Sequence, residues 1–279
     1  MKSILITGAS GFIGPHLLRR LAPEDPVTCA ALSNLEPLFE SHRFTHVYHL
    51  AAAGVRAESE RAQPCVSCNT LGTFELARMA VRFGVERFVF VGSGFEYRPQ
   101  ATPTDESAPL QASNLYGASK AAGWMLLDYL RREEGLPLVT VRPFAVYGPG
   151  EHPSKLIPYV LARARERKPI RLGGGEQIRD YLHVDDVIDA LIAAGNRPEA
   201  VGRVYNLGGG AANALSVRVI VHRILDLVEA PVSLCEFGAA LRPRTDPAYL
   251  VANPARAAAE LQWRARVTLD AGLRDLALA

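Results

Sequence analysis

A tyrosine and a lysine four residues apart, Tyr116 and Lys120 in "NLYGASK", are the side chains of this sequence best suited to moving a proton. Residues separated by four lie on one face of a helix, so the lysine ammonium can stabilise a phenolate and draw the tyrosine pKa from about 10 toward neutrality. Composition alone yields about 0.13 such pairs in a chain of this make-up. The spacing therefore suggests, without proving, a catalytic acid and its helper.

Glycines recur at fixed intervals in "GASGFIG" (8–14), which follows an apolar run and opens a helical pattern. Glycine permits a tight turn and close approach of a ligand, and a helix start offers free amide groups and a positive dipole. The spacing is one residue longer than the commonest dinucleotide fingerprint. The pattern predicts a pyrophosphate bound at this turn, with a glycine-rich turn lacking a ligand as the alternative.

Short apolar runs alternate with helical patterns in the first half of the chain, which is typical of a parallel sheet covered by helices on both faces. Strands are expected at 3–7, 45–52, 87–93 and 138–144, and helices at 12–22, 69–84, 116–135 and 154–167. We expect an α/β fold with a Rossmann-type doubly wound parallel sheet in residues 1–150. A smaller substrate-binding region, residues 151–279, follows, and the chain is expected to cross back from it to the first domain.

Charge and composition narrow the class of protein. A formal charge of +2 with 22% charged residues gives no reason to expect nucleic acid or a membrane surface as a partner. No stretch reaches the roughly 18–20 apolar residues that cross a bilayer, so we expect a cytoplasmic protein with reduced thiols. Cys65 and Cys68 in "PCVSC" lack further ligands at matched spacing, which favours ordinary helix residues over a metal or redox site.

Further motifs follow the glycine motif in order: "HLAA" (49–52), "NTLGT" (69–73), "RDYLHVDDV" (179–187), "VYNLGGG" (204–210) and "RPRTDPAYLVAN" (242–253). With them, nearly the whole chain resembles the extended short-chain dehydrogenase/reductase family, most of all its nucleotide-sugar epimerases, dehydratases and 4-ketoreductases. The resemblance implies that Ser93 holds the substrate oxygen, Tyr116 donates or accepts the proton, and Lys120 assists. It also implies a homodimer formed through the helices that start near Asn69 and Tyr116.

The resemblance further implies two sets of binding residues. Those expected to contact the dinucleotide are Gly8, Ser10, Gly11, Phe12, Ile13, Gly14, Leu32, Leu50, Ala51, Ala52, Asn69, Val91, Tyr116, Lys120, Pro143 and Val146. Those expected to contact a nucleotide-diphosphate sugar are Ser93, Phe95, Glu96, Arg179, Arg242 and Arg244. Guanidinium groups suit a diphosphate, although the arginines have an alternative as solvated residues or partners of Asp180 and Asp246. No metal is expected.

Departures from the family pattern narrow the reaction. The similar 4,6-dehydratases carry an Asp-Glu pair directly after the catalytic hydroxyl, where this sequence has Gly94 and Phe95, so elimination of water lacks its acid and base. Glu96 comes one position later and is expected, on a strand or extended loop, to face the other way. Ala145 stands where many relatives have an asparagine that contacts the substrate diphosphate.

The adenosine end of the expected cofactor site also departs from the pattern. NAD-dependent relatives end their second strand in an acid that binds the ribose 2′-hydroxyl, whereas residues 26–52 contain no Asp and the second strand-and-helix unit is shortened or missing. We therefore expect NADP(H), with Arg19, Arg20 or Arg43 near the 2′-phosphate. The alternative is NAD, with its ribose held by backbone groups around Leu32 to Asn34.

The function expected from these observations is NADP(H)-dependent reduction of a nucleotide-diphosphate 4-keto-6-deoxy-sugar, as in deoxysugar biosynthesis. A nucleotide-sugar 4-epimerase with tightly bound NAD is the alternative, because it would use the same Ser93, Tyr116 and Lys120. A non-catalytic dinucleotide sensor is a third reading, and the complete set of three catalytic residues argues against it.

Overall fold

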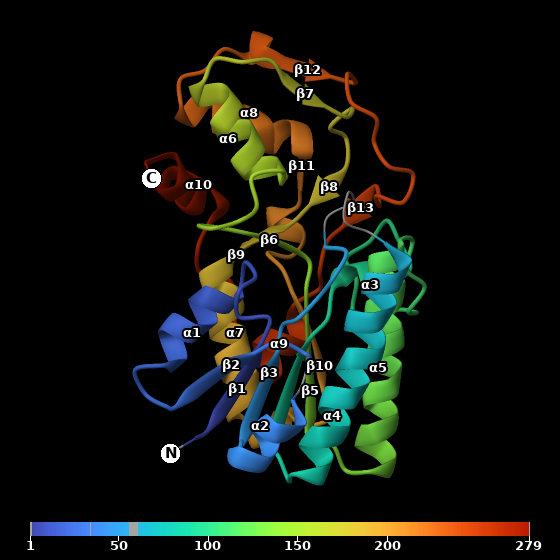
Figure 1. Ribbon diagram of the computed structural model, residues 1–279. Coiled ribbons are helices and arrows are strands. Elements are labelled where there is room, and N and C mark those ends of the chain that lie inside the picture. The colour runs from blue at the N-terminus through green and yellow to red at the C-terminus, as the bar shows by residue number, and fades with distance from the viewer. Residues whose placement is uncertain (1, 34, 56–60, 279) are drawn as a thin grey trace.

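A six-stranded parallel sheet forms the centre of the first domain (Figure 1). The computed structural model describes residues 2–33, 35–55 and 61–278. The strands are β1 (Ile4–Thr7), β2 (Val27–Ala30), β3 (His46–His49), β4 (Arg87–Val91), β5 (Leu138–Pro143) and β10 (Val204–Leu207), in the order β10-β5-β4-β3-β1-β2. Most are buried on both faces, which explains why they read as continuous apolar runs. The α/β Rossmann-type fold is confirmed.

Helices cover both faces of this sheet. Helices α1 (Gly14–Leu21) and α7 (Val184–Asn196) pack on one face, where they meet Ile4 and Ile6 of β1. Helices α4 (Thr73–Arg82) and α5 (Leu115–Glu133) pack on the other face, where Leu5 points. Because successive side chains of a strand point to opposite faces, the alternation along β1 divides the core into these two layers.

The second strand-and-helix unit is shortened, as expected. Strand β2 is the edge of the sheet, and α2 (Glu36–Ser41) has only 6 residues. The usual doubly wound order places one more strand beyond this edge. Here residues 31–45 lead directly from β2 to β3, and a parallel crossover alone needs a dozen or more residues. The chain is therefore too short at this point to add that strand.

The region after residue 150 has a core of its own, built from α6 (Leu156–Arg165), α8 (Val217–Leu227) and α10 (Leu269–Leu278). Its short strands are β7 (Ile170–Leu172), β8 (Ile178–Arg179), β11 (Leu215–Ser216), β12 (Cys235–Phe237) and β13 (Tyr249–Leu250). β9 (Tyr181–His183) pairs with β6 (Ala145–Tyr147). Helix α7, β10 and α9 (Ala255–Glu260) return to the first domain, so the chain passes between the two regions several times (Figure 1).

The other expected elements agree with the observed bounds to within two residues, but one strand and one helix differ more. The expected strand at 45–52 ends at His49, and the expected helix at 69–84 divides into a π-helical turn, Ser67–Gly72, followed by α4. A short helix, α3 (Ala62–Val66), precedes that turn, and further single turns lie at Gly94–Glu96, Pro198–Ala200, Ala211–Asn213 and Val232–Leu234. No helix within the described residues is long and apolar enough to cross a membrane.

Candidate active site

The glycine loop between β1 and α1 has the geometry of a ligand-binding turn. Gly8 has a φ of +77°, and the N–H of Gly11 donates to its carbonyl at 3.0 Å. A Cβ on Gly8 would lie 2.5 Å from the amide nitrogen of Ala51, and a Cβ on Gly14 would lie 2.4 Å from the carbonyl oxygen of Ala9. Close packing therefore requires glycine at both positions, and at Gly8 the backbone conformation requires it as well.

The expected dinucleotide contacts gather at one edge of the sheet. Thr7, His49, Val91 and Pro143 each end a strand, and these parallel strands are neighbours. Ligands of open α/β sheets bind outside the carboxyl ends of the strands, where the order reverses. The glycine loop and Leu50 to Ala52 lie at this edge, and Leu32 packs close to Gly72 of the π-helical turn. The structure thus brings most of the expected cofactor residues together.

Ser93 and Tyr116 are hydrogen-bonded to each other through their side chains. Ser93 follows β4, begins the short turn Gly94–Glu96 and is 5% exposed. Tyr116 lies in the first turn of α5, which Asn114 caps by accepting from the N–H of Gly117 at 2.8 Å. A Cβ on Gly117 would lie 2.1 Å from the carbonyl oxygen of Phe95, so this glycine lets α5 approach the serine turn.

Lys120 lies one turn further along α5 and is 1% exposed. Its Nζ has no hydrogen-bond partner among the described residues and lies 4.7 Å from the centre of the Phe90 ring. Burial lowers the pKa of Lys120 to about 8, while the charge of Glu96 opposes this effect. A buried ammonium without a partner fits a ribose hydroxyl of a bound dinucleotide, so the residues present suit that cofactor.

The expectation that Lys120 draws the Tyr116 pKa toward neutrality is wrong for the protein without its cofactor. The pKa of Tyr116 is raised above its ordinary value, first by burial and next by the charge of Glu96, and the bond from Ser93 opposes this only in part. A phenol with a raised pKa keeps its proton at neutral pH. The arrangement thus favours Tyr116 as a proton donor.

Glu96 is not placed to bind substrate, and the expected extended conformation is also wrong. It lies in the turn Gly94–Glu96, is 0% exposed, and pairs with the Nε of Arg142 at 2.7 Å. Its other oxygen accepts from the N–H of Ser93 at 2.7 Å. The turn directs the carboxylate back under the catalytic serine, because the turn is closed by a capping box and not by a strand.

The positions that carry acids in dehydratases lie beside the catalytic pair. A Cβ on Gly94 would come within 2.7 Å of the Phe144 ring, so the site has no room for an aspartate there without movement. The Phe95 ring lies edge-on to Tyr116 with the ring centres 6.4 Å apart. An apolar ring therefore stands where elimination would need a general base.

Two of the arginines that were expected to bind the substrate diphosphate, Arg179 and Arg242, form ion pairs with a carboxylate instead. Arg179 Nη2 binds Asp246 Oδ1 at 2.5 Å, and Arg242 Nε binds the other oxygen of Asp246 at 3.0 Å. Asp180, the other suggested partner, instead accepts from the amides of Gly210 and Ala252. Arg242 and Arg244 line one surface groove together with Asp246. Arg179 and Arg242 are therefore ion-paired in this structure, which was the alternative to binding a diphosphate. Asp246 joins the two arginines in one cluster.

Comparison with known proteins supports this arrangement. The model of the NAD-dependent epimerase/dehydratase family matches residues 4–208. The chain belongs to this family. It is 28% identical to the dTDP-D-glucose 4,6-dehydratase of Mus musculus, over 98% of this chain and 87% of that protein. It is 31% identical to the UDP-glucuronate 4-epimerase of Thermodesulfobacterium geofontis, over 86% of this chain and 73% of that protein.

Solved structures give the same result. The dehydratase DesIV of Streptomyces venezuelae, solved with NAD and TYD bound, aligns with a TM-score of 0.90 and 25% identity, over 99% of this chain and 96% of that one. MoeE5, in complex with UDP-glucose and NAD, aligns with a TM-score of 0.87 and 27% identity, over 97% and 96%. As a member of this epimerase/dehydratase family, the protein is an oxidoreductase or epimerase that acts on nucleotide sugars.

The Asn69 side chain, expected at the cofactor, is bound by protein groups and has a structural role in this family member. Its amide group donates to the carbonyl of Ala53 at 2.9 Å and to Ser119 Oγ at 2.9 Å, and its oxygen accepts from the N–H of Ala53 at 2.8 Å. Both of its N–H donors are therefore used. Asn69 joins the segment after β3 to α5 and holds the loop that carries Ala51 and Ala52, so it positions the cofactor edge.

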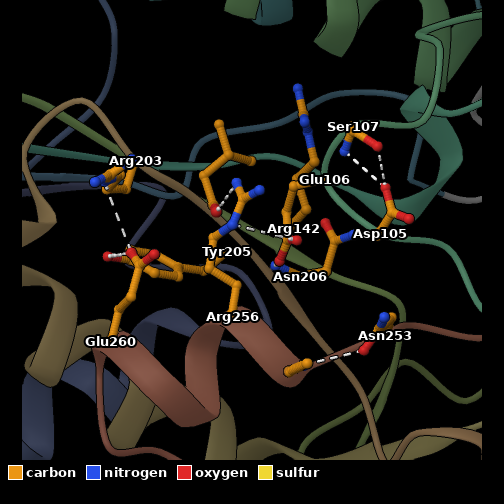
Figure 2. A network of polar contacts seen from close by, with 12 residues as sticks. Asp105, Glu106, Ser107, Arg142, Arg203, Tyr205, Asn206, Asn253, Arg256 and Glu260 are labelled. Atoms are coloured by element: carbon orange, nitrogen blue, oxygen red, sulfur yellow. Dashed lines mark hydrogen bonds and ion pairs between the residues drawn. The ribbon is translucent and has the colours of Figure 1, made fainter.

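A polar network joins β5 and β10 to residues 97–106 and was not anticipated from the sequence; Figure 2 shows its part around Glu106 and Asn206. Asn206 of β10 accepts from the Tyr97 hydroxyl at 2.8 Å, and its backbone N–H donates to Glu106 at 2.8 Å. Arg142 donates to the same Tyr97 hydroxyl at 2.9 Å. The network ties β5 and β10 to the loop after the catalytic turn. One sequence signal was present, because Ser93 followed three residues later by Glu96 is a capping-box pattern.

Proposed function

We propose that this family member reduces the 4-keto group of a nucleotide-diphosphate 4-keto-6-deoxy-sugar, with NADP(H) as the reductant. The hydrogen bond between Ser93 and a protonated Tyr116, beside the buried Lys120, is the observation that carries the proposal. Ser93 would hold the keto oxygen and Tyr116 would give it a proton, while the Lys120 ammonium would stabilise the phenolate left behind. The bound nicotinamide would supply the hydride.

The absence of acids beside Ser93 supports reduction over dehydration. A 4,6-elimination needs one group to remove a proton and another to protonate the leaving hydroxyl. Gly94 and Phe95 can do neither, and Glu96 is occupied by Ser93 and Arg142. What remains at the site is hydride transfer with proton transfer at one oxygen, and this is the chemistry of a reductase or an epimerase.

The preference for NADP(H) rests on the end of β2, where Ala30 and the exposed Ala31 stand in place of an acid. Two of the three suggested arginines have a partner or lie far from the cofactor edge. Arg20 pairs with Asp189 at 2.8 Å. Arg43 precedes β3 and so lies at the amino end of the strands, roughly 13 Å of strand length from the cofactor edge. Arg19 remains as a candidate, and Asn34 lies outside the described residues.

The cofactor preference can be measured directly. Without a carboxylate to repel the 2′-phosphate, NADPH should bind at least about tenfold more tightly than NADH if one charge-assisted contact forms. Ala31→Asp restores a carboxylate and should reduce that ratio, whereas Ala31→Asn, of the same size and uncharged, should not. Equal affinities in the wild type would reject the NADP(H) preference.

Turnover decides between the two enzymatic candidates. Purified protein would be offered dTDP-, GDP-, CDP- and UDP-linked 4-keto-6-deoxy-sugars with NADPH, and loss of NADPH in proportion to product would support the reductase. The 4-epimerase is favoured by one observation, since solved relatives bind NAD together with nucleotide sugars. Interconversion of UDP-sugars by NAD that stays bound through purification would reject reduction in its favour. Turnover of either kind would eliminate a non-catalytic sensor.

We also propose a homodimer through α5 and the π-helical turn. Four apolar side chains there are well exposed: Val66 at 43%, Leu71 at 56%, Met125 at 62% and Tyr129 at 47%. Contacts between α5, α3 and the π-helical turn place them in one region of the surface. Exposed apolar groups that lie together are typical of a protein interface.

A further inference from the structure

Glu96 is a fully buried carboxylate that the proposed chemistry does not use. One oxygen accepts from the backbone N–H of Ser93 at 2.7 Å, and the other pairs with Arg142 at 2.7 Å. Its charge also acts on both other catalytic residues. It raises the pKa of Tyr116 after burial has done so, and it opposes the lowering of the Lys120 pKa that burial causes.

We propose that Glu96 is a positioning residue of the active site, which fixes Ser93 through one oxygen, is held by Arg142 through the other, and so places a buried negative charge behind the catalytic residues. The inference rests on the proposed function for the roles of Ser93 and Lys120 and adds a residue that the family motifs do not include. Both oxygens of Glu96 are bound by protein groups, Ser93 and Arg142, so it acts through its neighbours.

The backbone is built to admit this carboxylate. A Cβ on Gly92 would lie 2.3 Å from Glu96 Oε1, so glycine at position 92 lets the carboxylate reach the strand end. On the other side, the Arg142 guanidinium is stacked between the rings of Tyr97 and Trp124, at 4.8 and 4.7 Å. The space at Gly92 and the fixed guanidinium of Arg142 together hold the Glu96 carboxylate in this position.

Lys120 depends on this charge because it has little else to stabilise it. Its Nζ lacks a hydrogen-bond partner in the described part of the chain, and a buried ammonium without water favours its neutral form. The titratable groups around Glu96 and Lys120 are Tyr116 on α5, Arg142 on β5, Tyr97 after the turn, Cys65 and Cys68 on α3 and the π-helical turn, and His49 on β3. Glu96 supplies the carboxylate in this set.

The test measures the protonation of Lys120 without substrate. The chain has only four lysines, Lys2, Lys120, Lys155 and Lys168, so protein labelled with ¹³C at the lysine ε position gives a simple spectrum. The Lys120 signal is identified by its loss in Lys120→Met. Its midpoint in the wild type is expected at about 8. Glu96→Gln keeps an oxygen for the Ser93 N–H but removes the charge, and should move the midpoint down by about one unit.

Two further variants separate charge from position. Glu96→Asp keeps the charge but withdraws the carboxylate by about 1.5 Å, so it should retain a midpoint near that of the wild type while turnover falls because Ser93 is less well held. Glu106→Gln is the matched control. It neutralises a second carboxylate whose side chain is buried, which accepts from the N–H of Asn206 (Figure 2) and does not act on Lys120, so it should leave the midpoint unchanged.

Glu96→Gln leaves Arg142 without its partner and can prevent folding, so Glu96→Gln/Arg142→Met serves as the second variant. A folded form of either variant with the wild-type Lys120 midpoint would overturn the proposal, and so would an equal shift in Glu106→Gln. If a substrate is turned over, the alkaline limb of the pH–rate profile of Glu96→Gln should shift to lower pH by the same amount as the NMR midpoint of Lys120. A shifted midpoint together with a failed substrate panel would reject the ketoreductase and leave the role of Glu96 supported.

Discussion

Replacing Lys120 by methionine is expected to stabilise the protein in the absence of cofactor while it abolishes activity. The ammonium is buried without a hydrogen-bond partner among the described residues, and burial lowers its pKa from 10.5 to about 8. The difference of 2.5 units, at about 1.36 kcal/mol each, puts the cost of keeping this charge in the fold at about 3 kcal/mol. Methionine has a similar length and no charge, so it fills the space without that cost.

The stability gained in Lys120→Met should depend on pH, because the pKa of Lys120 is lowered in the folded protein. The pKa of Lys120 is lower in the folded protein than in the unfolded chain, so the folded protein binds fewer protons between about pH 8 and 10.5. Across that interval this group makes the wild type more stable as pH rises. Below pH 8 the full cost is present. The advantage of Lys120→Met should therefore be largest near neutral pH and should vanish toward pH 10.5.

Thermal unfolding of the ligand-free protein checks this prediction. A gain of about 3 kcal/mol should raise the Tm by about 6 °C at pH 7 for a chain of this size, with no gain at pH 10.5. Lys120→Arg is the matched control, because arginine keeps its charge and cannot relieve the cost. A variant that is less stable than the wild type at pH 7, or that gains equally at every pH, would refute the reasoning.

Three further outcomes are expected. Tyr116→Phe should lower turnover by about 10²- to 10⁴-fold with little change in the dinucleotide Kd, because only proton transfer is lost; near-normal turnover would make "NLYGASK" a coincidence. Burial raises the pKa of Glu151 from 4.5 to about 8, so the wild type should lose stability as pH rises across that interval. Glu151→Gln should reduce the slope of the unfolding free energy against pH by up to about 1.36 kcal/mol per pH unit. An unchanged slope in urea titrations would contradict this prediction. Met125→Glu should shift the proposed dimer toward monomer in sedimentation, and a wild type that is monomeric at micromolar concentration would reject the dimer.

The parts of the site that the sequence predicted are those with local signals. The glycine loop follows from spacing and its flanking elements, and the pairing of Tyr116 with Lys120 follows from helix periodicity. The sheet was predictable because strands buried on both faces read as apolar runs. The shortened second unit was visible from chain length between β2 and β3. Each of these inferences uses residues close in sequence.

The parts that the sequence could not predict depend on partners far away in the chain. Arg142 meets Glu96 across 46 positions, and Arg179 meets Asp246 across 67. An expected diphosphate ligand and a paired arginine have the same local pattern, so only the fold distinguishes them. The structural contacts of Asn69 were not visible for the same reason, since Ser119, which accepts from its amide, lies 50 residues later.

The cost of the Lys120 charge links cofactor binding to stability. A dinucleotide ribose would give the ammonium the hydrogen-bond acceptor that the described protein groups do not provide. Part of the binding free energy would then come from removing the cost of the unpaired buried charge. The Lys120→Met variant has no buried charge at this position for a ligand to stabilise. At one fixed, saturating concentration, the dinucleotide should therefore raise the Tm of the wild type more than that of the variant, because the added hydrogen bond appears as a tighter Kd in the wild type. The charge of Glu96 lowers the cost of the buried ammonium without removing it. Lys120 therefore stays charged near neutral pH, and its Nζ still lacks a hydrogen-bond acceptor that a ligand could supply.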